Sequence, residues 1–224
     1  MPGKFIVIDG TDGSGKTVQT TMLIDRLTKE GHAVVVEDFP RYKEPSSYFV
    51  SKMLKGEYGT LAEQPPHRSS YFYALDRFDA SFGMKENLNN GKIIVSNRFT
   101  SSNIGHQGAK FSSIDERKEF FIWLDHLEYE EFSIPRPDRV FFLHVPVEKS
   151  LELIEERLIN KERTEKDIAE SNPEHLRQAS ISYNLACDTF PYWERIECME
   201  NTNMRSKEDI HEEIYQKTLE LLID

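Results

Sequence analysis

Short apolar runs alternate along the chain with longer stretches in which apolar residues recur every three or four positions. The short runs are typical of strands buried on both faces, and the longer stretches are typical of amphipathic helices. Strands are predicted at 5–9, 33–37, 92–96, 139–145 and 195–199, and helices at 16–29, 46–55, 64–89, 113–132, 147–160, 173–189 and 206–222. This alternation predicts an α/β fold, a five-stranded parallel sheet flanked by helices.

Composition narrows the class of protein. The 224 residues suit one domain, residues 1–224. The 39 acidic residues exceed the 28 Lys and Arg residues, and the net charge of -11 argues against nucleic acid or an anionic membrane as a partner. Two cysteines cannot form a disulfide framework, and no apolar segment of membrane-spanning length or signal-peptide pattern is found. We therefore expect a cytoplasmic protein.

A glycine-rich segment follows the first predicted strand. It fits the pattern Gly-x4-Gly-Lys-Thr with the residues Gly10, Thr11, Asp12, Gly13, Ser14, Gly15, Lys16 and Thr17. Such loops turn backbone N–H groups toward phosphate oxygens, while the lysine supplies positive charge and the threonine hydroxyl can bind Mg2+. The dipole of the following helix favours an anion at the same point. The segment predicts a nucleotide-phosphate site, and the alternative is a glycine-rich turn with a structural role only.

Basic and short polar residues follow the second and third predicted strands. In a parallel sheet, ligands bind at the carboxyl ends of the strands. The residues at these ends are Arg41, Tyr42 and Lys43, and then Arg98, Ser101, Ser102 and Asn103. The arginines suit a second anion and the short polar side chains suit a base edge. Solvated loop charges and simple helix capping are the alternatives.

Tyr73 and Arg77 are four residues apart in a predicted helix, so they share one of its faces. An aromatic ring beside a guanidinium suits a nucleoside monophosphate, with its base stacked on Tyr73 and its phosphate bound by Arg77. Packing of Tyr73 in the core explains the pattern equally well.

Together these segments resemble the thymidylate kinases. The resemblance is carried by the loop at 9–17, by Phe-Pro-Arg-Tyr at 39–42, by Ala-Leu-Asp-Arg at 74–77 and by Asn-Arg-Phe-Thr-Ser-Ser-Asn at 97–103. Weaker motifs at 56–59, 106–110 and 137–145 follow in the family's order, so that the match spans nearly the whole chain. The resemblance implies transfer of the γ-phosphoryl group of ATP to dTMP, giving dTDP and ADP, with Mg2+ as cofactor. Such catalysis depends on positioning and on cations.

The resemblance also assigns roles to residues. The loop from Gly10 to Thr17 would bind ATP, with Thr17, Asp12 and Asp9 as candidate ligands of Mg2+. Lys16, Asp12 and Arg98 would be catalytic. The acceptor would be bound by Arg41, Tyr42, Tyr73, Arg77, Arg98, Ser102, Asn103, His106 and Gln107. In this assignment Tyr73 stacks on the base, Ser102 and Asn103 contact thymine, and His106 excludes a 2′-hydroxyl group.

Two departures from the family pattern affect the catalytic groups. Positions 11–14 carry no basic side chain, and one branch of the family supplies the missing arginine from a lid, which we expect at about 156–171. Arg163 is the first candidate there, followed by Arg157 and Lys161, and the alternative is a charged, solvated helix end. Asn97 stands where the family usually has aspartate, so a carboxylate that often supports Mg2+ is absent. Compensation by Asp12 or Asp9, a weaker Mg2+ site and a shifted acceptor preference are the alternatives.

Other functions use the same phosphate-binding loop. A GTPase-like switch would need Asn-Lys-x-Asp after a late strand and Asp-x-x-Gly after the third strand, and neither motif is present. A kinase acting on another nucleoside monophosphate or on a deoxynucleoside is the nearer alternative. Relatives form homodimers, and the apolar helices at 64–89 and 113–132 suit such an interface, although core packing explains them equally well.

Overall fold

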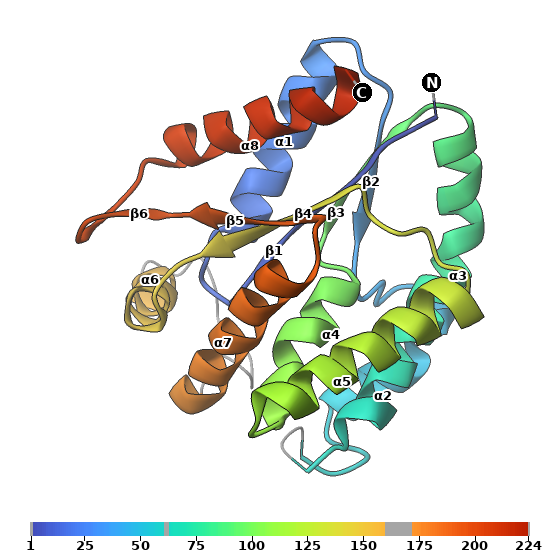
Figure 1. Ribbon diagram of the computed structural model, residues 1–224, viewed down its shortest axis with the longest axis vertical. Coiled ribbons are helices and arrows are strands. Elements are labelled where there is room, and N and C mark those ends of the chain that lie inside the picture. Colours follow the sequence, from blue (N-terminus) through green and yellow to red (C-terminus); the bar gives the residue numbers. More distant parts are fainter. Residues whose placement is uncertain (1, 61–62, 160–171, 224) are drawn as a thin grey trace.

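The computed structural model describes residues 2–60, 63–159 and 172–223, apart from the side chains of residues 157 and 158 (Figure 1). Five parallel strands form the central sheet in the order β2-β3-β1-β4-β5. Their bounds are β1 Phe5–Gly10, β2 Val34–Asp38, β3 Ile93–Asn97, β4 Arg139–His144 and β5 Trp193–Glu197. The predicted five-stranded parallel sheet is therefore confirmed.

Alternate residues of β1 enter two different cores. Phe5 and Val7 pack into a cluster with α3, α4, α5 and α7, whereas Ile6 and Ile8 pack into a cluster with α1 and α8. All six residues of β1 are buried. A strand covered on both faces needs apolar residues at every position, and this explains the continuous run in the sequence.

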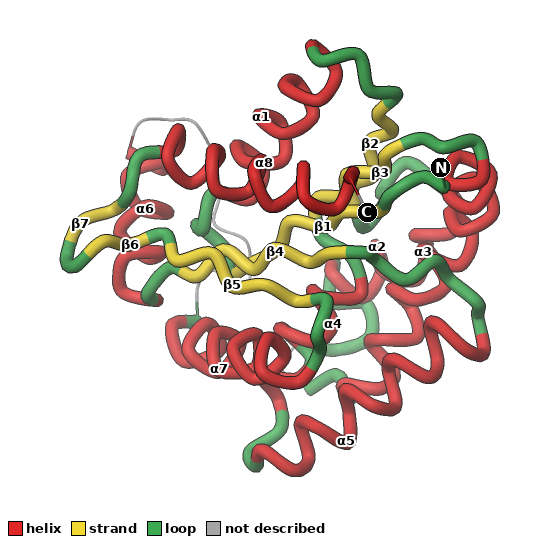
Figure 2. Tube along the Cα trace, turned by 45° about the horizontal axis from the view of Figure 1, so that its top comes forward, coloured by secondary structure: helices red, strands yellow, loops and turns green. Residues whose placement is uncertain are grey.

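Helices cover both faces of the sheet (Figures 1 and 2). One face carries α1 (Lys16–Lys29) and α8 (Lys207–Ile223). The other carries α3 (Pro66–Asn89), α4 (Thr100–His106), α5 (Ile114–Asp125) and α7 (Pro173–Thr189). The remaining α-helices in the described ranges are α2 (Tyr48–Leu54), which packs on α3, and α6 (Val147–Ile159), which lies at the carboxyl end of β4.

Three features differ from the sequence-based expectation. Helix α4 was not predicted, because Thr, Ser and Asn are typical of caps and turns rather than of helix interiors. The predicted helix 113–132 is α5 followed by a π-helical turn, His126–Glu131. Strand β5 begins two residues earlier than expected, and a short hairpin of β6 (Met199–Glu200) and β7 (Asn203–Met204) follows it (Figure 2). Across the described ranges, no helix combines the length and apolarity needed to cross a bilayer.

A buried ion pair joins α3 to the π-helical turn. Arg77 donates from Nε and Nη2 to the two carboxylate oxygens of Glu128, at 2.7 and 2.6 Å. The two side chains are 2% and 0% exposed. Thr100, the first residue of α4, donates its hydroxyl to the same carboxylate at 2.6 Å. A buried charge is tolerated only when it is paired and hydrogen-bonded, so this contact fixes three elements to one another.

Replacing Glu128 with leucine should lower the free energy of unfolding by about 3–5 kcal/mol, because Arg77 would remain buried without a counter-charge. Chemical denaturation followed by circular dichroism measures the change. The double variant Arg77→Met/Glu128→Leu should recover most of the loss, since neither charge is then buried. A single variant as stable as the unaltered protein would contradict this account.

Candidate active site

The glycine-rich loop connects β1 to α1 and is shaped by backbone conformations that favour glycine. Gly13 has φ 84° and Gly15 has φ 90°. A Cβ atom at Gly13 would come within 2.7 Å of the Ser150 carbonyl oxygen in α6, so a side chain does not fit there. In the described part of the chain, no side chain caps the N-terminus of α1. Its first N–H groups and its dipole are therefore available to an anion.

Lys16 lies across this loop. Its Nζ donates to the carbonyl oxygens of Gly10 and Thr11 at 3.0 and 2.9 Å and lies 3.6 Å from Asp12 Oδ1. Burial lowers the pKa of Lys16 to about 8, and the charge of Arg98 acts in the same direction. A phosphate oxygen would give this ammonium group a better partner than two carbonyls.

Asp12 pairs with Arg98 across the site. Arg98 Nη2 donates to Asp12 Oδ1. Burial alone would raise the pKa of Asp12, but the charges of Arg98 and Lys16 and the hydrogen bond from Arg98 hold that pKa well below its usual range. The loop from β1 and the carboxyl end of β3 thus place two cations around one carboxylate.

Arg98 has a strained backbone that its neighbours hold in place. Its φ is 68°, in the left-handed region that non-glycine residues rarely occupy. Its N–H donates to the Ile8 carbonyl oxygen at 3.1 Å, and its carbonyl oxygen accepts from the Ser96 hydroxyl at 2.6 Å. Such strain persists where the surroundings over-determine the conformation, and it concentrates at functional sites.

Asp9 joins the loop to α4 and α7. Its carboxylate accepts hydrogen bonds from Gly10 N, from the hydroxyls of Ser101 and Ser102, and from Tyr183 at 2.7, 2.6, 2.8 and 3.1 Å, respectively. Asp9 is 0% exposed. These four hydrogen bonds join the loop to α4 and α7, and the expected contact of Asp9 with Mg2+ stays a prediction.

Four of the residues expected to bind the acceptor lie in or directly after α4, namely Ser102, Asn103, His106 and Gln107. Ser102 and His106 lie beside Arg98, with the Ser102 hydroxyl and His106 Nε2 each 3.4 Å from Arg98 Nη1. Asn103 is buried in the same helix, and its Nδ2 donates to the Ser70 carbonyl oxygen in α3 at 3.5 Å. Gln107 is 8% exposed, and its Oε1 has no hydrogen-bond partner within the described chain. We refer to these four residues, of which Gln107 directly follows the helix, as the polar face of α4, and two of them, Ser102 and His106, contact Arg98.

Arg41 lies at the carboxyl end of β2, where α3 binds it. Its Nε donates to Asp76 Oδ1 at 3.1 Å, and its Nη2 donates to Asp79 Oδ2 and to the Ser46 hydroxyl at 2.6 and 2.8 Å. Burial would lower the pKa of Arg41, but the hydrogen bond to Asp79 and the charge of Asp76 raise it. Tyr42 is 60% exposed beside it, and Tyr73 is half-buried in α3.

Arg77 is not brought into contact with the loop. Its guanidinium points into the protein, where it binds Glu128, and its Nη1 donates to the Phe99 carbonyl oxygen at 3.4 Å. Its expected contact with an acceptor phosphate stays a prediction, as does the role of Tyr73. Lys161 and Arg163 and most of the expected lid lie outside the described residues, as does the side chain of Arg157.

Sequence reasoning missed several residues that complete this site. Asn97 donates to Asp38 Oδ1 at 3.0 Å, which places a carboxylate beside the position where we noted its absence. Tyr183 donates to Asp9, which lies 174 positions earlier in the sequence, and His175 contacts His106, which lies 69 positions earlier. No local pattern marks such partners, because only the packing of α7 on α4 brings them into the site.

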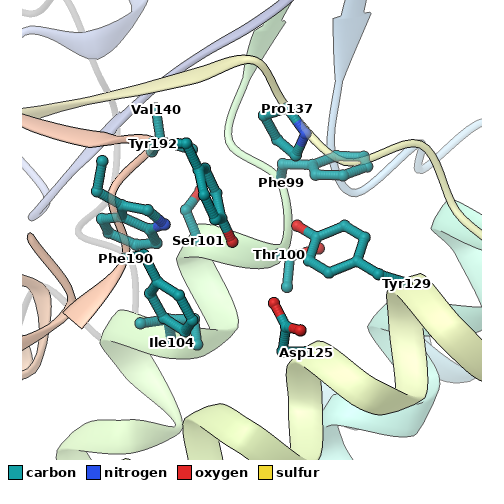
Figure 3. A pocket seen from close by; sticks show the side chains of 11 residues that line it. Phe99, Thr100, Ser101, Ile104, Asp125, Tyr129, Pro137, Val140, Phe190 and Tyr192 are labelled. Atoms are coloured by element: carbon teal, nitrogen blue, oxygen red, sulfur yellow. The ribbon is translucent and has the colours of Figure 1, made fainter.

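A small internal cavity lies behind the site (Figure 3). Its lining includes Phe99, Thr100, Ser101, Tyr129 and Tyr192. Its volume of about 10 Å³ has room for roughly one water molecule, so it is too small for a nucleotide. The candidate active site is therefore the open carboxyl edge of the sheet and not this enclosed space.

Known proteins resemble the chain over most of its length. The family model described as thymidylate kinase matches residues 8–214. A protein named thymidylate kinase from Halothermothrix orenii is 30% identical over 227 aligned positions that cover 100% of both chains. A probable thymidylate kinase from Thermococcus onnurineus is 28% identical over 94% of both chains, and a thymidylate kinase from Brachyspira hyodysenteriae is 32% identical over 70% of both. The chain belongs to the thymidylate kinase family.

Proposed function

We propose that this protein transfers the γ-phosphoryl group of ATP to dTMP, forming dTDP and ADP. The observation that carries the proposal is the cluster of Lys16, Asp12 and Arg98, in which the loop and the end of β3 place two cations around one carboxylate. Two polyanions must approach each other during this reaction, and fixed cations between them lower that electrostatic cost. Membership of the thymidylate kinase family supports dTMP as the acceptor.

The donor side of the site is the loop from Gly10 to Thr17. Backbone N–H groups of the loop and of the first turn of α1 would bind the phosphates of ATP, and Lys16 would move from its carbonyl partners to a phosphate oxygen. The acceptor side is formed by Arg98, Arg41 and the polar face of α4. There Ser102, Asn103 and Gln107 would hydrogen-bond the nucleoside, and His106 would lie beside the sugar.

The residues present fit a magnesium ion. Mg2+ is held by one or two carboxylates or hydroxyls together with phosphate oxygens and water. Asp12 supplies an ionised carboxylate, and Thr17 is exposed at the second position of α1. When bound with ATP, the ion would neutralise charge on the phosphates. Asp12 would then serve both the ion and Arg98.

An assay of ADP release tests the proposal directly. With ATP and Mg2+, dTMP should be turned over far faster than dUMP, dCMP, dGMP, UMP, CMP or thymidine, and EDTA should abolish the activity. Preference for another monophosphate would mean that the acceptor is misassigned. Slow ATP hydrolysis with every acceptor would contradict the kinase assignment and favour a switch-like role.

Arg98→Lys should lower kcat/KM for dTMP by about 100-fold or more, because lysine keeps the charge but loses the planar fork that binds two oxygens. The matched control is Arg26→Lys, since Arg26 lies over the ring of Tyr215 and pairs with Glu212, both in α8. The control should keep full activity. Equal activity of both variants would remove Arg98 from the catalytic groups.

We further propose that the active form is a homodimer that pairs through α3. Tyr71, Leu75, Phe78 and Phe82 follow one another at spacings of four, three and four residues, which is the spacing of a helix-pairing seam. They are 43%, 40%, 37% and 63% exposed, and Ile122 of α5 is 68% exposed. A contiguous apolar stripe on a long helix suits the same stripe on a second copy.

Phe82→Asp should convert the dimer to a monomer, because it places a charge on the most exposed residue of the apolar stripe. Size-exclusion chromatography with light scattering would report the mass of one chain instead of two. Ile181→Asp is the matched control, since Ile181 is 49% exposed on α7, and it should leave the mass unchanged. A monomeric unaltered protein, or a dimeric Phe82→Asp variant, would contradict this interface.

A further inference from the structure

Two histidines face each other where α4 meets α7. His106 is the last residue of α4, and His175 is the third residue of α7. The distance from His106 Nδ1 to His175 Nε2 is 3.3 Å, the ring planes differ by 17°, and the ring centroids are 5.5 Å apart. The centroid distance exceeds the nitrogen distance by roughly the two ring radii. The rings therefore lie edge to edge, with a nitrogen of each pointing at the other.

The direction of the hydrogen bonds follows from Arg98. A guanidinium has donors only, so the nitrogen that it contacts must accept. Arg98 Nη1 lies 3.4 Å from His106 Nε2, so this nitrogen carries no proton. A neutral His106 then carries its proton on Nδ1 and donates it to His175 Nε2. His175 in turn carries its proton on Nδ1.

Burial disfavours the charged form of both rings. Burial lowers the pKa of His106 to about 4, with the nearby charge of Arg98 acting in the same direction and that of Asp12 opposing it. Burial also lowers the pKa of His175, and the charge of Lys110 adds to this effect. A charged His106 would present a proton to Arg98 and repel it, so neutrality preserves the contact.

The helix that carries His175 is joined to the site at two points, where Ser182 donates to the Ile104 carbonyl oxygen at 2.6 Å and Tyr183 donates to Asp9. At the N-terminus of this helix, the Asn172 side chain accepts from His175 N at 3.1 Å. A Cβ atom at Gly105 would come within 2.1 Å of the Tyr183 ring, which shows how closely α4 and α7 approach. His175 is thus presented to His106 by a rigid helix pair.

We propose that His175 is a positioning residue of the active site, which fixes the proton of His106 on Nδ1 and so keeps Nε2 as the acceptor that orients Arg98 toward Asp12. The proposal rests on the proposed function insofar as Arg98 acts in phosphoryl transfer. Without His175, the proton of His106 can move to Nε2, where it would point at the donors of Arg98. The guanidinium would then lose one of its three side-chain contacts.

The matched variants are His175→Leu and His175→Gln. Leucine removes the acceptor, whereas the Oε1 atom of glutamine can take the place of Nε2 and restore it. His175→Leu should lower kcat for dTMP about tenfold, because a displaced guanidinium stabilises the transferring group poorly. The KM for ATP should change less than about twofold, since His175 does not touch the loop. His175→Gln should recover most of kcat, and thermal unfolding would show that both variants fold.

The tautomers are read without any substrate by 15N NMR of the histidine rings, with the His106 signals assigned by their loss in His106→Asn. The unaltered protein and His175→Gln should show the Nδ1–H form of His106, and His175→Leu should show the Nε2–H form. An Nε2–H or charged His106 in the unaltered protein would overturn the proposal, as would an unchanged kcat in a folded His175→Leu. Failure of the proposed function has a different signature, namely the expected tautomers with no turnover of dTMP.

Discussion

The arrangement of the site depends on one buried carboxylate. Asp9 lies at the carboxyl end of β1, is fully buried, and accepts hydrogen bonds from the loop, from two serines of α4 and from Tyr183 of α7. A buried charge without such partners would cost several kcal/mol. The carboxylate therefore forces three elements that are distant in sequence to converge on the start of the phosphate-binding loop. The loop, α4 and α7 thus meet beside Asp12 and Arg98.

Charges of alternating sign extend outward from this point. Lys16, Asp12 and Arg98 follow one another in contact, and the neutral His106 ends the series. The protein as a whole carries a net charge of -11, so binding of an anionic ligand depends on this local order and not on the overall field. Burial would raise the pKa of Asp12, but the charges of Arg98 and Lys16 lower it. The carboxylate therefore stays ionised between the two cations. The strained backbone of Arg98 is held by hydrogen bonds from β1 and β3, so its side chain reaches Asp12 from a fixed base.

Sequence reasoning succeeded where local pattern and structure agree. The bounds of α1 and α7 match the predicted helices 16–29 and 173–189, because periodicity, a glycine before α1 and proline at the start of α7 all act locally. It failed at α4, whose polar composition is overridden by packing of Gly105 on Tyr183 and by the bonds of Ser101 and Ser102 to Asp9. It also could not find His175 or Tyr183, since a partner supplied by a distant helix leaves no mark on the sequence around the loop.

Arg77 shows how one spacing rule can lead to two different environments. The spacing of four residues places Tyr73 and Arg77 on neighbouring positions of α3, yet Tyr73 is half-buried and Arg77 is 2% exposed. The difference comes from Glu128, which the π-helical turn carries into the interior, where it binds both nitrogens of the guanidinium fork. Arg77 also donates to the carbonyl oxygen of Phe99, the residue that follows Arg98, while Thr100 donates to Glu128. The buried pair therefore supports, from behind, the backbone segment that presents Arg98, and it connects stability of the core with the geometry of the site.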